Sequence, residues 1–378
     1  MAGESDAAKN PKGQTAEIAA SPRNPTLSAE NAERMGQPRI SGMTRREAML
    51  DLLRVGGVAA GAAGAAFWLS ERSSRPIPEQ AEQARRDHRV AVDAQWPQMT
   101  VVYYPTDKDP SAGAPVAQGG EPRALAAQAI ANLGGMSRFI SKQDVVVLKP
   151  NIAWDRTPEQ AANTNPDLVA EVVRQCWQAG ARRVIVTDVS CGEPQRCFHR
   201  SGIQAAARAE GAEVILPDPD RFREVDMGGV VLKSWPVFTP FLEADKVINL
   251  PIAKHHALTG ATLGMKNWYG ILGGQRNRLH QQIHQSLVDL ANFMLPTLTF
   301  LDCYRVLLRN GPTGGNPEDV ALKKTLVAGT DPVAIDAYVA KAYWNLDAEK
   351  MPYLAMAAAR GLGTVDFAAL NVKVSQLG

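Results

Sequence analysis

Short uninterrupted runs of apolar residues limit most strongly what this chain can fold into. Examples are VVVL at 145–148 and VIV at 184–186. A strand with one face in water alternates apolar and polar residues, whereas a strand that is buried on both faces is apolar throughout. Parallel sheets that are covered by helices contain strands of the second kind. The sequence therefore predicts the α/β class, with a mainly parallel sheet and helices on both of its faces.

The remaining patterns alternate between strand and helix. Strands are predicted near residues 100–104, 144–148, 183–187, 213–216, 247–250, 297–301 and 325–328. Helices are predicted near residues 122–133, 166–179, 201–210 and 281–294, with one more that opens at Asp331-Pro332 and one that ends at Gly361. No internal repeat is evident. We therefore expect a single α/β domain over residues 99–378.

The residues before this domain form three segments. Residues 1–43 are rich in Ala, Ser, Asn, Pro and charge and lack apolar periodicity, so they are predicted to be disordered. Within residues 44–70, the pair Arg45-Arg46 precedes an apolar, Gly/Ala-rich run at 55–69, which resembles a twin-arginine export signal. Residues 71–98 are charged and are predicted to be a linker. These segments predict an exported, periplasmic protein that is recognised by the twin-arginine export machinery.

The apolar run at 55–69 has two other interpretations. As a helix its 15 residues would span only ~22 Å, short of the ~30 Å hydrocarbon core, so a permanent membrane anchor is the weaker one. An amphipathic helix that packs on the domain is the other. The signal also departs from the usual pattern, because Ala48 stands where a large apolar residue is usual and a long segment precedes the arginines. Met43 is therefore an alternative translation start.

Composition and cysteine spacing exclude several functions. Lys and Arg total 41 against 39 Asp and Glu, a net charge of +2, and no basic run contains interleaved aromatic residues. A nucleic-acid partner is therefore not expected. Cys176, Cys191, Cys197 and Cys303 match no CxxC or ferredoxin spacing, so no iron–sulfur or zinc cysteine site is predicted. Cys191 and Cys197 are close enough in sequence to pair in an oxidising compartment.

Polar side chains follow the predicted strands at the points where the strands end. They are Lys149 and Asn151, then Asp188, then Lys254, His255 and His256, and finally Asp302. In open parallel sheets, ligands bind beyond the carboxyl ends of the strands. These side chains are therefore predicted to share one rim of the sheet. Three lysines near that rim, with Lys266 as the third, would lower one another's pKa and favour an anionic ligand, a carboxylate or a phosphate.

The stretch at 247–274 concentrates side chains that can perform chemistry. It is interpreted as a buried strand, a break at Pro251 and then a loop, with five glycines that let the backbone approach a ligand closely. Adjacent residues point in different directions, so Lys254 and His256 are favoured over His255 as a converging pair. All three are candidate catalytic residues: the lysine would bind charge, and a histidine, which titrates near working pH, would move a proton. The alternative is a solvated loop face.

Other polar residues are candidates for ligand binding. They are Lys149, Asn151, Asn165, Asp188, Thr259, Lys266, Asn267 and Asp331. For Asn165 and Asp331 the alternative is helix capping, because each precedes a proline whose missing N–H costs nothing at the first helical position. For Lys266 the alternative is a surface lysine beside an apolar anchor.

A transition metal is predicted only by His280 and His284. They stand four residues apart in a predicted helix, a spacing that places both imidazoles on one face. No Glu follows His280, which excludes HExxH zinc-protease chemistry. The alternative is two histidines that contact water or neighbours near a helix start. No P-loop, GxSxG or strand-linked GxGxxG motif is present, so the cofactor is otherwise unknown.

Several short motifs, in order along the chain, resemble the domain-of-unknown-function family 362. They are Leu148-Lys149-Pro150-Asn151, Thr164-Asn165-Pro166, residues 184–188, Asn249-Leu250-Pro251 with Lys254 and His256, Leu258-Thr259-Gly260, Met265-Lys266-Asn267 and residues 329–334. The resemblance covers roughly residues 145–365 and implies a shared fold and site. Many members of that family carry an additional ferredoxin-like segment with iron–sulfur clusters, and this sequence contains none. The resemblance implies no particular reaction.

Two classes of function stay open at this point. The first is an exported enzyme that acts on a small anionic substrate, with lysines that bind charge and His256 or His255 that moves a proton. The second is a non-catalytic accessory protein of a periplasmic redox system, which binds a cofactor or metal and has a redox partner.

Overall fold

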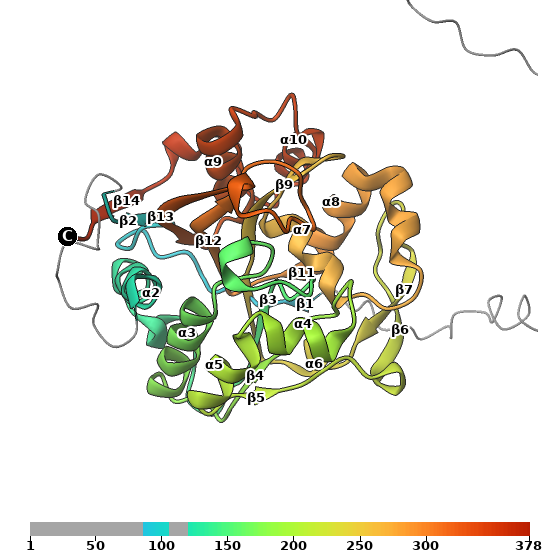
Figure 1. Cartoon of the computed structure of the whole chain (residues 1–378), viewed down its shortest axis with the longest axis horizontal. Coiled ribbons are helices and arrows are strands. Elements are labelled where there is room, and N and C mark those ends of the chain that lie inside the picture. Colours follow the sequence, from blue (N-terminus) through green and yellow to red (C-terminus); the bar gives the residue numbers. More distant parts are fainter. Residues whose placement is uncertain (1–85, 106–119) are drawn as a thin grey trace, which may run out of the picture. The chain divides into compact units, whose positions relative to one another are not determined.

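The computed structural model describes residues 86–105 and 120–378 (Figure 1). The predictions for residues 1–43 and 44–70, and for most of the linker at 71–98, lie outside these described residues. Over the two described ranges, no helix is both long enough and apolar enough to cross a membrane.

One large sheet forms the centre of the described body (Figure 1). Its main path has the strand order β14-β2-β13-β12-β8-β3-β4-β5. These strands are β2 (Met99–Tyr103), β3 (Val145–Pro150), β4 (Arg183–Val186), β5 (Glu213–Val214), β8 (Lys246–Leu250), β12 (Leu298–Leu307), β13 (Val320–Gly329) and β14 (Val372–Gln376). From β12 to β5 every neighbour is parallel, as is β14 with β2, whereas β13 is antiparallel to both of its neighbours. The predicted α/β class with a mainly parallel sheet is confirmed.

Helices and apolar side chains cover both faces of this sheet. The helices are α2 (Gly120–Asn132), α3 (Pro166–Gln178), α4 (Pro194–Arg200) and α5 (Ile203–Ala209) on one side, and α6 (Pro240–Glu243), α8 (Ile283–Phe293), α9 (Pro332–Trp344) and α10 (Pro352–Ala359) on the other. Successive residues of β3 alternate between the two sides: Val146 and Leu148 belong to one core cluster, Val145 and Val147 to the other. Both faces of β3 are buried, which explains its uninterrupted apolar run.

Two helix starts follow the predicted capping pattern. The Asn165 side chain accepts a hydrogen bond from the Asp167 N–H at the start of α3. Asp331 accepts from the N–H groups of Val333 and Ala334 at the start of α9. Each cap satisfies N–H groups that have no partner within the helix.

The segment after Pro251 is a β-hairpin, so the predicted loop is wrong. It consists of β9 (Ile252–His256) and β10 (Gly260–Thr262), which pair antiparallel with Lys254 opposite Thr262. On its other side β9 runs parallel to β12. The physical reason is tertiary: β12 continues to Leu307, well beyond its predicted end, and supplies hydrogen-bond partners that local sequence does not reveal.

The remaining strands form small two-stranded sheets. β1 (Arg86–Asp87) pairs with β11 (Met294–Leu295), and β6 (Phe222–Asp226) pairs with β7 (Ser234–Phe238). The short helix α7 (Gly264–Asn267) follows the hairpin and continues into a 3₁₀ turn at Trp268–Ile271. This turn and the hairpin enclose the space beyond the carboxyl ends of β3 and β4.

Candidate functional site

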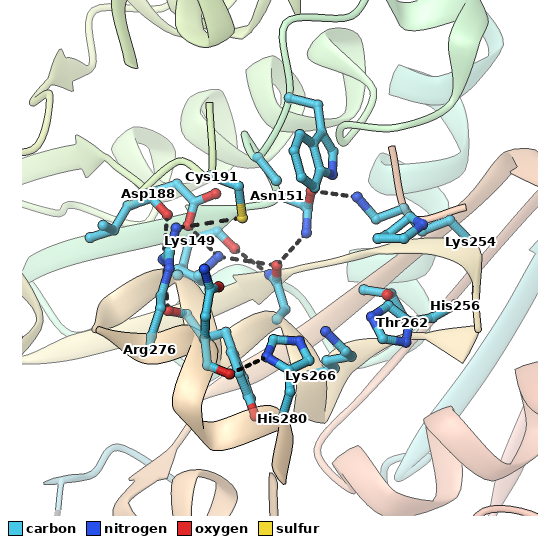
Figure 2. Close-up of a pocket in the computed structure, with 18 of the residues that line it drawn as sticks. Lys149, Asn151, Asp188, Cys191, Lys254, His256, Thr262, Lys266, Arg276 and His280 are labelled. Carbon is cyan, nitrogen blue, oxygen red and sulfur yellow. Dashed lines mark hydrogen bonds and ion pairs between the residues drawn. The ribbon is translucent and has the colours of Figure 1, made fainter. Parts of the chain in front are cut away.

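A cavity of about 410 Å³ lies beyond the carboxyl ends of β3 and β4 (Figure 2). Seven of the eleven predicted catalytic and ligand-binding residues line it: Lys149, Asn151, Asp188, Lys254, His256, Lys266 and Asn267. Among the other lining residues are Cys191, Thr262, Tyr269, Arg276 and His280. Four Lys and Arg side chains therefore face the cavity against one carboxylate, that of Asp188.

Lys149, at the end of β3, has three oxygen atoms around its Nζ, two in hydrogen bonds and one in an ion pair. Its Nζ lies 2.6 Å from Asp188 Oδ1 and donates to the Pro150 carbonyl at 2.9 Å and to Asn267 Oδ1 at 3.0 Å. Both members of the ion pair are buried. Asp188 is held further by the backbone N–H of Ile152, which donates to its Oδ2 at 2.6 Å. Because protein oxygens surround its Nζ, Lys149 holds Asp188 and Asn267 in position.

Two amide side chains link Lys149 to Lys254. Asn267 Oδ1 accepts from Lys149 Nζ and, at 3.0 Å, from Asn151 Nδ2. Asn151 Oδ1 in turn accepts from Lys254 Nζ at 3.0 Å. Asn249 Oδ1 accepts from Asn267 Nδ2 at 2.8 Å. Because an ammonium group can only donate, these contacts fix the orientation of both amides.

Lys254, on β9, uses two of its three donors. Its Nζ donates to Asn151 Oδ1 and, at 2.6 Å, to the carbonyl of Ala162. Burial lowers the pKa of Lys254 to about 7, and the charges of Lys266 and Lys149 act in the same direction. A neutral amine would keep both hydrogen bonds, because it has two N–H donors and one lone pair. Lys254 can therefore exchange its third proton without losing its position.

His256 lies two residues further along β9, on the same side of the strand as Lys254. Its Nδ1 accepts from the Leu258 N–H at 3.2 Å and lies 3.1 Å from Thr259 Oγ1, which itself donates to the Ala261 carbonyl. The acceptor role of Nδ1 assigns the ring proton to Nε2. Burial, with the charge of Lys266, lowers the pKa of His256 to about 3.

His256 is therefore neutral at physiological pH and acts as a hydrogen-bond donor. This changes the chemistry expected from the sequence, in which a histidine with an ordinary pKa moves the proton. Lys254, whose pKa burial lowers to about 7, has the property that a group needs for proton transfer at pH 7.

Lys266, on α7, has no hydrogen bond or ion pair with any described residue. Only 9% of it is exposed, and its Nζ lies 4.9 Å from the centroid of the Tyr269 ring. Burial lowers the pKa of Lys266 to about 8. Helix α7 is held in place by Asp336, which accepts from the N–H groups of Gly264 at 2.7 Å and Met265 at 2.9 Å. Lys266 thus presents an uncommitted ammonium group at a fixed place.

Arg276 holds together two walls of the cavity. Its Nη1 donates to the carbonyls of Val189 at 2.7 Å and Tyr269 at 3.0 Å, and its Nη2 donates to the Ser190 carbonyl at 2.6 Å. Nη2 also lies 3.5 Å from Cys191 Sγ. Local sequence could not indicate this role, because Arg276 is 85 to 87 residues from its partners in the loop after β4.

Four predicted site residues do not line the cavity. Asn165 and Asp331 cap helices, which is the alternative given for them above. Thr259 contacts the cavity only through His256. The ring of His255 faces away from its neighbours Lys254 and His256, as alternation along β9 requires, and its Nδ1 accepts from the Gly311 N–H at 3.2 Å.

The helical spacing that predicted a metal at His280 and His284 does not exist. α8 begins at Ile283, and His280 lies before it in a 3₁₀ segment at Arg276–Gln282. His280 stacks on His256 with ring centroids 6.1 Å apart, whereas His284 stacks on Tyr353 at 6.3 Å. Throughout residues 86–105 and 120–378, no group of three or more His, Cys, Asp or Glu side chains could hold a metal ion.

Fold and site together define an α/β protein with a buried, lysine-rich cavity at the carboxyl rim of a mainly parallel sheet. The chain belongs to the family described as Domain of unknown function (DUF362), which matches residues 146–341. A curated relative is the thylakoid-associated protein sll1697 of Synechocystis. The two are 27% identical over an alignment of 245 residues, which covers 61% of this chain and 72% of the relative.

Two solved structures match part of the chain. The lactate racemase apoprotein of Thermoanaerobacterium thermosaccharolyticum has a TM-score of 0.34 and 13% identity, over 64% of this chain and 56% of that one. A protein of Thermotoga maritima has a TM-score of 0.31 and 12% identity, over 65% of this chain and 60% of that one. The chain thus spans less than two thirds of either structure.

Proposed function

We propose that the cavity binds a small anion, a carboxylate or a phosphate, and that the protein is an enzyme in which Lys254 exchanges a proton with that anion. The observation that carries this proposal is Lys266, a lysine that is nine-tenths buried, lines the cavity and has no polar side-chain partner in the described part of the chain. An unpaired buried charge is costly, and a bound anion would offset that cost. The excess of cationic over anionic side chains around the cavity supports the same ligand class.

The three lysines take different roles in this proposal. Lys149 positions Asp188 through an ion pair and the amide pair through its hydrogen bond to Asn267. Lys266 supplies the free positive charge for the ligand. Lys254 keeps its place in either protonation state and so serves as the general acid or base. The Nε2–H of neutral His256 is then a donor for a ligand oxygen.

Thermal shift at low salt tests the ligand class. A ligand at 100 times its dissociation constant stabilises the folded state by ~2.7 kcal/mol, and each kcal/mol raises the melting midpoint of a body of this size by ~2 to 4 °C. We expect carboxylates or phosphorylated metabolites to raise the midpoint by several degrees. Lys266→Ala should weaken the best ligand by about 10- to 100-fold, because a charged hydrogen-bond partner is lost. Lys373→Ala, an exposed lysine away from the cavity, is the matched control.

The pH dependence of this binding is a further readout. Affinity should fall as the pH rises past about 8, because Lys266 then loses its proton, and this fall should be absent in Lys266→Ala. If Lys266→Ala and Lys254→Ala both retain the full ligand response, the anion site lies elsewhere. A cofactor or metal that co-purifies with the protein, without turnover of any anion, would favour the alternative of an accessory protein in a periplasmic redox system.

We also propose that the chain is exported through the twin-arginine machinery, with the segments at 1–43, 44–70 and 71–98 preceding the domain at 99–378. The arginine pair and the apolar run at 55–69 support this, and the related Synechocystis protein is thylakoid-associated. Replacing Arg45 and Arg46 together by lysine should leave the protein in the cytoplasm, as cell fractionation would show. Undiminished export of that variant would eliminate the twin-arginine signal.

A further inference from the structure

Cys191 differs from the other three cysteines in its surroundings. It is exposed and lines the cavity, whereas Cys176, Cys197 and Cys303 are buried, and all four thiols are free. Burial raises the pKa of the Cys197 thiol to about 11 and also raises the pKa of Cys176 and Cys303. Because the thiolate is the nucleophilic form, the three buried thiols are protected from reaction.

The Cys191 thiol is held at the cavity wall by contacts on two sides. The Cys191 N–H donates to the carbonyl of Ala153 at 3.0 Å. Arg276 fixes the preceding carbonyl of Ser190 and places its Nη2 3.5 Å from Cys191 Sγ (Figure 2). A partly exposed thiol in electropositive surroundings is the setting in which reactive cysteines occur.

A second observation indicates that a ligand occupies the space in front of this thiol. Lys266 lines the same cavity, is nine-tenths buried and has no polar partner among the described residues. Thr262, also in the cavity wall and only 4% exposed, has a buried Oγ1 that makes no hydrogen bond. Native proteins rarely leave buried polar groups unsatisfied, so both side chains are placed to contact a molecule bound in the cavity.

We propose that Cys191 is a nucleophile that forms a covalent bond with an anionic electrophile held by Lys266. The inference rests on the proposed anion binding and narrows the ligand to a small carboxylate with an electrophilic carbon. In the reaction the thiol proton leaves to solvent and the thiolate attacks that carbon. An S–C bond forms, the bond from the carbon to its leaving group breaks, and the leaving group departs with the electron pair.

Iodoacetate and iodoacetamide are a matched pair of probes, because both form an S–C bond and release iodide but only the first is an anion. The rate at which each modifies Cys191 is followed by mass spectrometry of the folded protein. The ratio of the two rates is then compared with the ratio for N-acetylcysteine. We expect the protein to favour iodoacetate by about 10- to 100-fold more than the free thiol does, the factor expected for one charged hydrogen bond.

Variants separate this inference from the function on which it rests. Lys266→Gln should bring the ratio close to that of N-acetylcysteine, Lys373→Gln should leave it unchanged, and Cys191→Ser should abolish the modification. A ratio for native protein equal to that of the free thiol overturns the inference. If anions still raise the melting midpoint in that case, binding in the cavity stands and only the covalent step fails. If they do not, both proposals fail.

Discussion

At the scale of single residues, three lysines around one cavity differ in how many donors are already occupied. Lys149 donates two hydrogen bonds and forms an ion pair with Asp188, Lys254 donates two hydrogen bonds, and the Lys266 side chain donates none to any described residue. The sequence could place all three near one rim, because two of them follow strands that end there. It could not distinguish their roles, because the partners are distant: Asn267 is 118 residues from Lys149, and Asn151 is 103 residues from Lys254.

Lys254 should make stability depend on pH. Its pKa is about 7 in the folded protein and ~10.4 in an unfolded chain. Between these values the unfolded chain binds more protons, so the free energy of unfolding rises with pH, by up to about 1.4 kcal/mol per pH unit from this group. Urea unfolding between pH 7 and 10 should therefore show a smaller slope against pH for Lys254→Met than for native protein. Equal slopes would mean that Lys254 keeps an ordinary pKa when folded.

At the scale of elements, the hairpin carries Lys254 and His256 into the cavity wall, although the sequence predicted a loop there. Lys254 and His256 were favoured as a pair because neighbouring residues diverge, and the two-residue period of β9 produces that divergence. The sequence did not predict the strand, because β12, which pairs with one edge of β9, lies about fifty residues later in the chain. At His280 and His284 the four-residue spacing places both rings on one face only if one α-helix contains both residues. α8 begins at Ile283, three residues after His280, so the spacing rule does not apply.

The 3₁₀ turn at Trp268–Ile271 leaves room for the buried ion pair. A Cβ on Gly270 would overlap Asp188 Oδ1 and come within 2.5 Å of Lys149 Nζ. Gly270→Ala should therefore lower the free energy of unfolding by about 1 to 3 kcal/mol, as overpacking does. In an Asp188→Ala background the same change should cost less, since the overlapping carboxylate is gone. Equal costs in the two backgrounds, measured by urea unfolding, would show that the methyl group clashes elsewhere.

At the scale of the whole molecule, the region that matches the family does not include every strand of the sheet. The match at 146–341 begins one residue inside β3 and ends within α9. β2 and β14 lie outside it, yet β2 pairs with the full second half of β13, and β14 pairs with β2. Sequence patterns predicted β2 but not β14, because its VKVSQ alternates as an exposed edge strand does and buries little.

A fragment limited to residues 146–341 should therefore be insoluble or aggregate. It would lack the first residue of β3 and would expose the unpaired backbone of Thr325–Gly329 at the sheet edge, and an open edge pairs readily with other chains. A fragment of residues 86–378 should stay monomeric and melt cooperatively. Size-exclusion chromatography and thermal melts of the two fragments make the comparison, and a soluble, cooperatively melting short fragment would contradict it.

The pairing of β14 with β2 also sets a practical rule for experiments with related proteins. Grafting the cavity of another family member onto this chain by exchanging only the matched region would keep β2 and β14 from this protein. The β13 strand of the other protein would then have to pair with β2 of this protein, which itself remains paired with β14. A successful chimera therefore requires complementarity at the seam between β13 and β2, a seam that contains none of the residues lining the cavity.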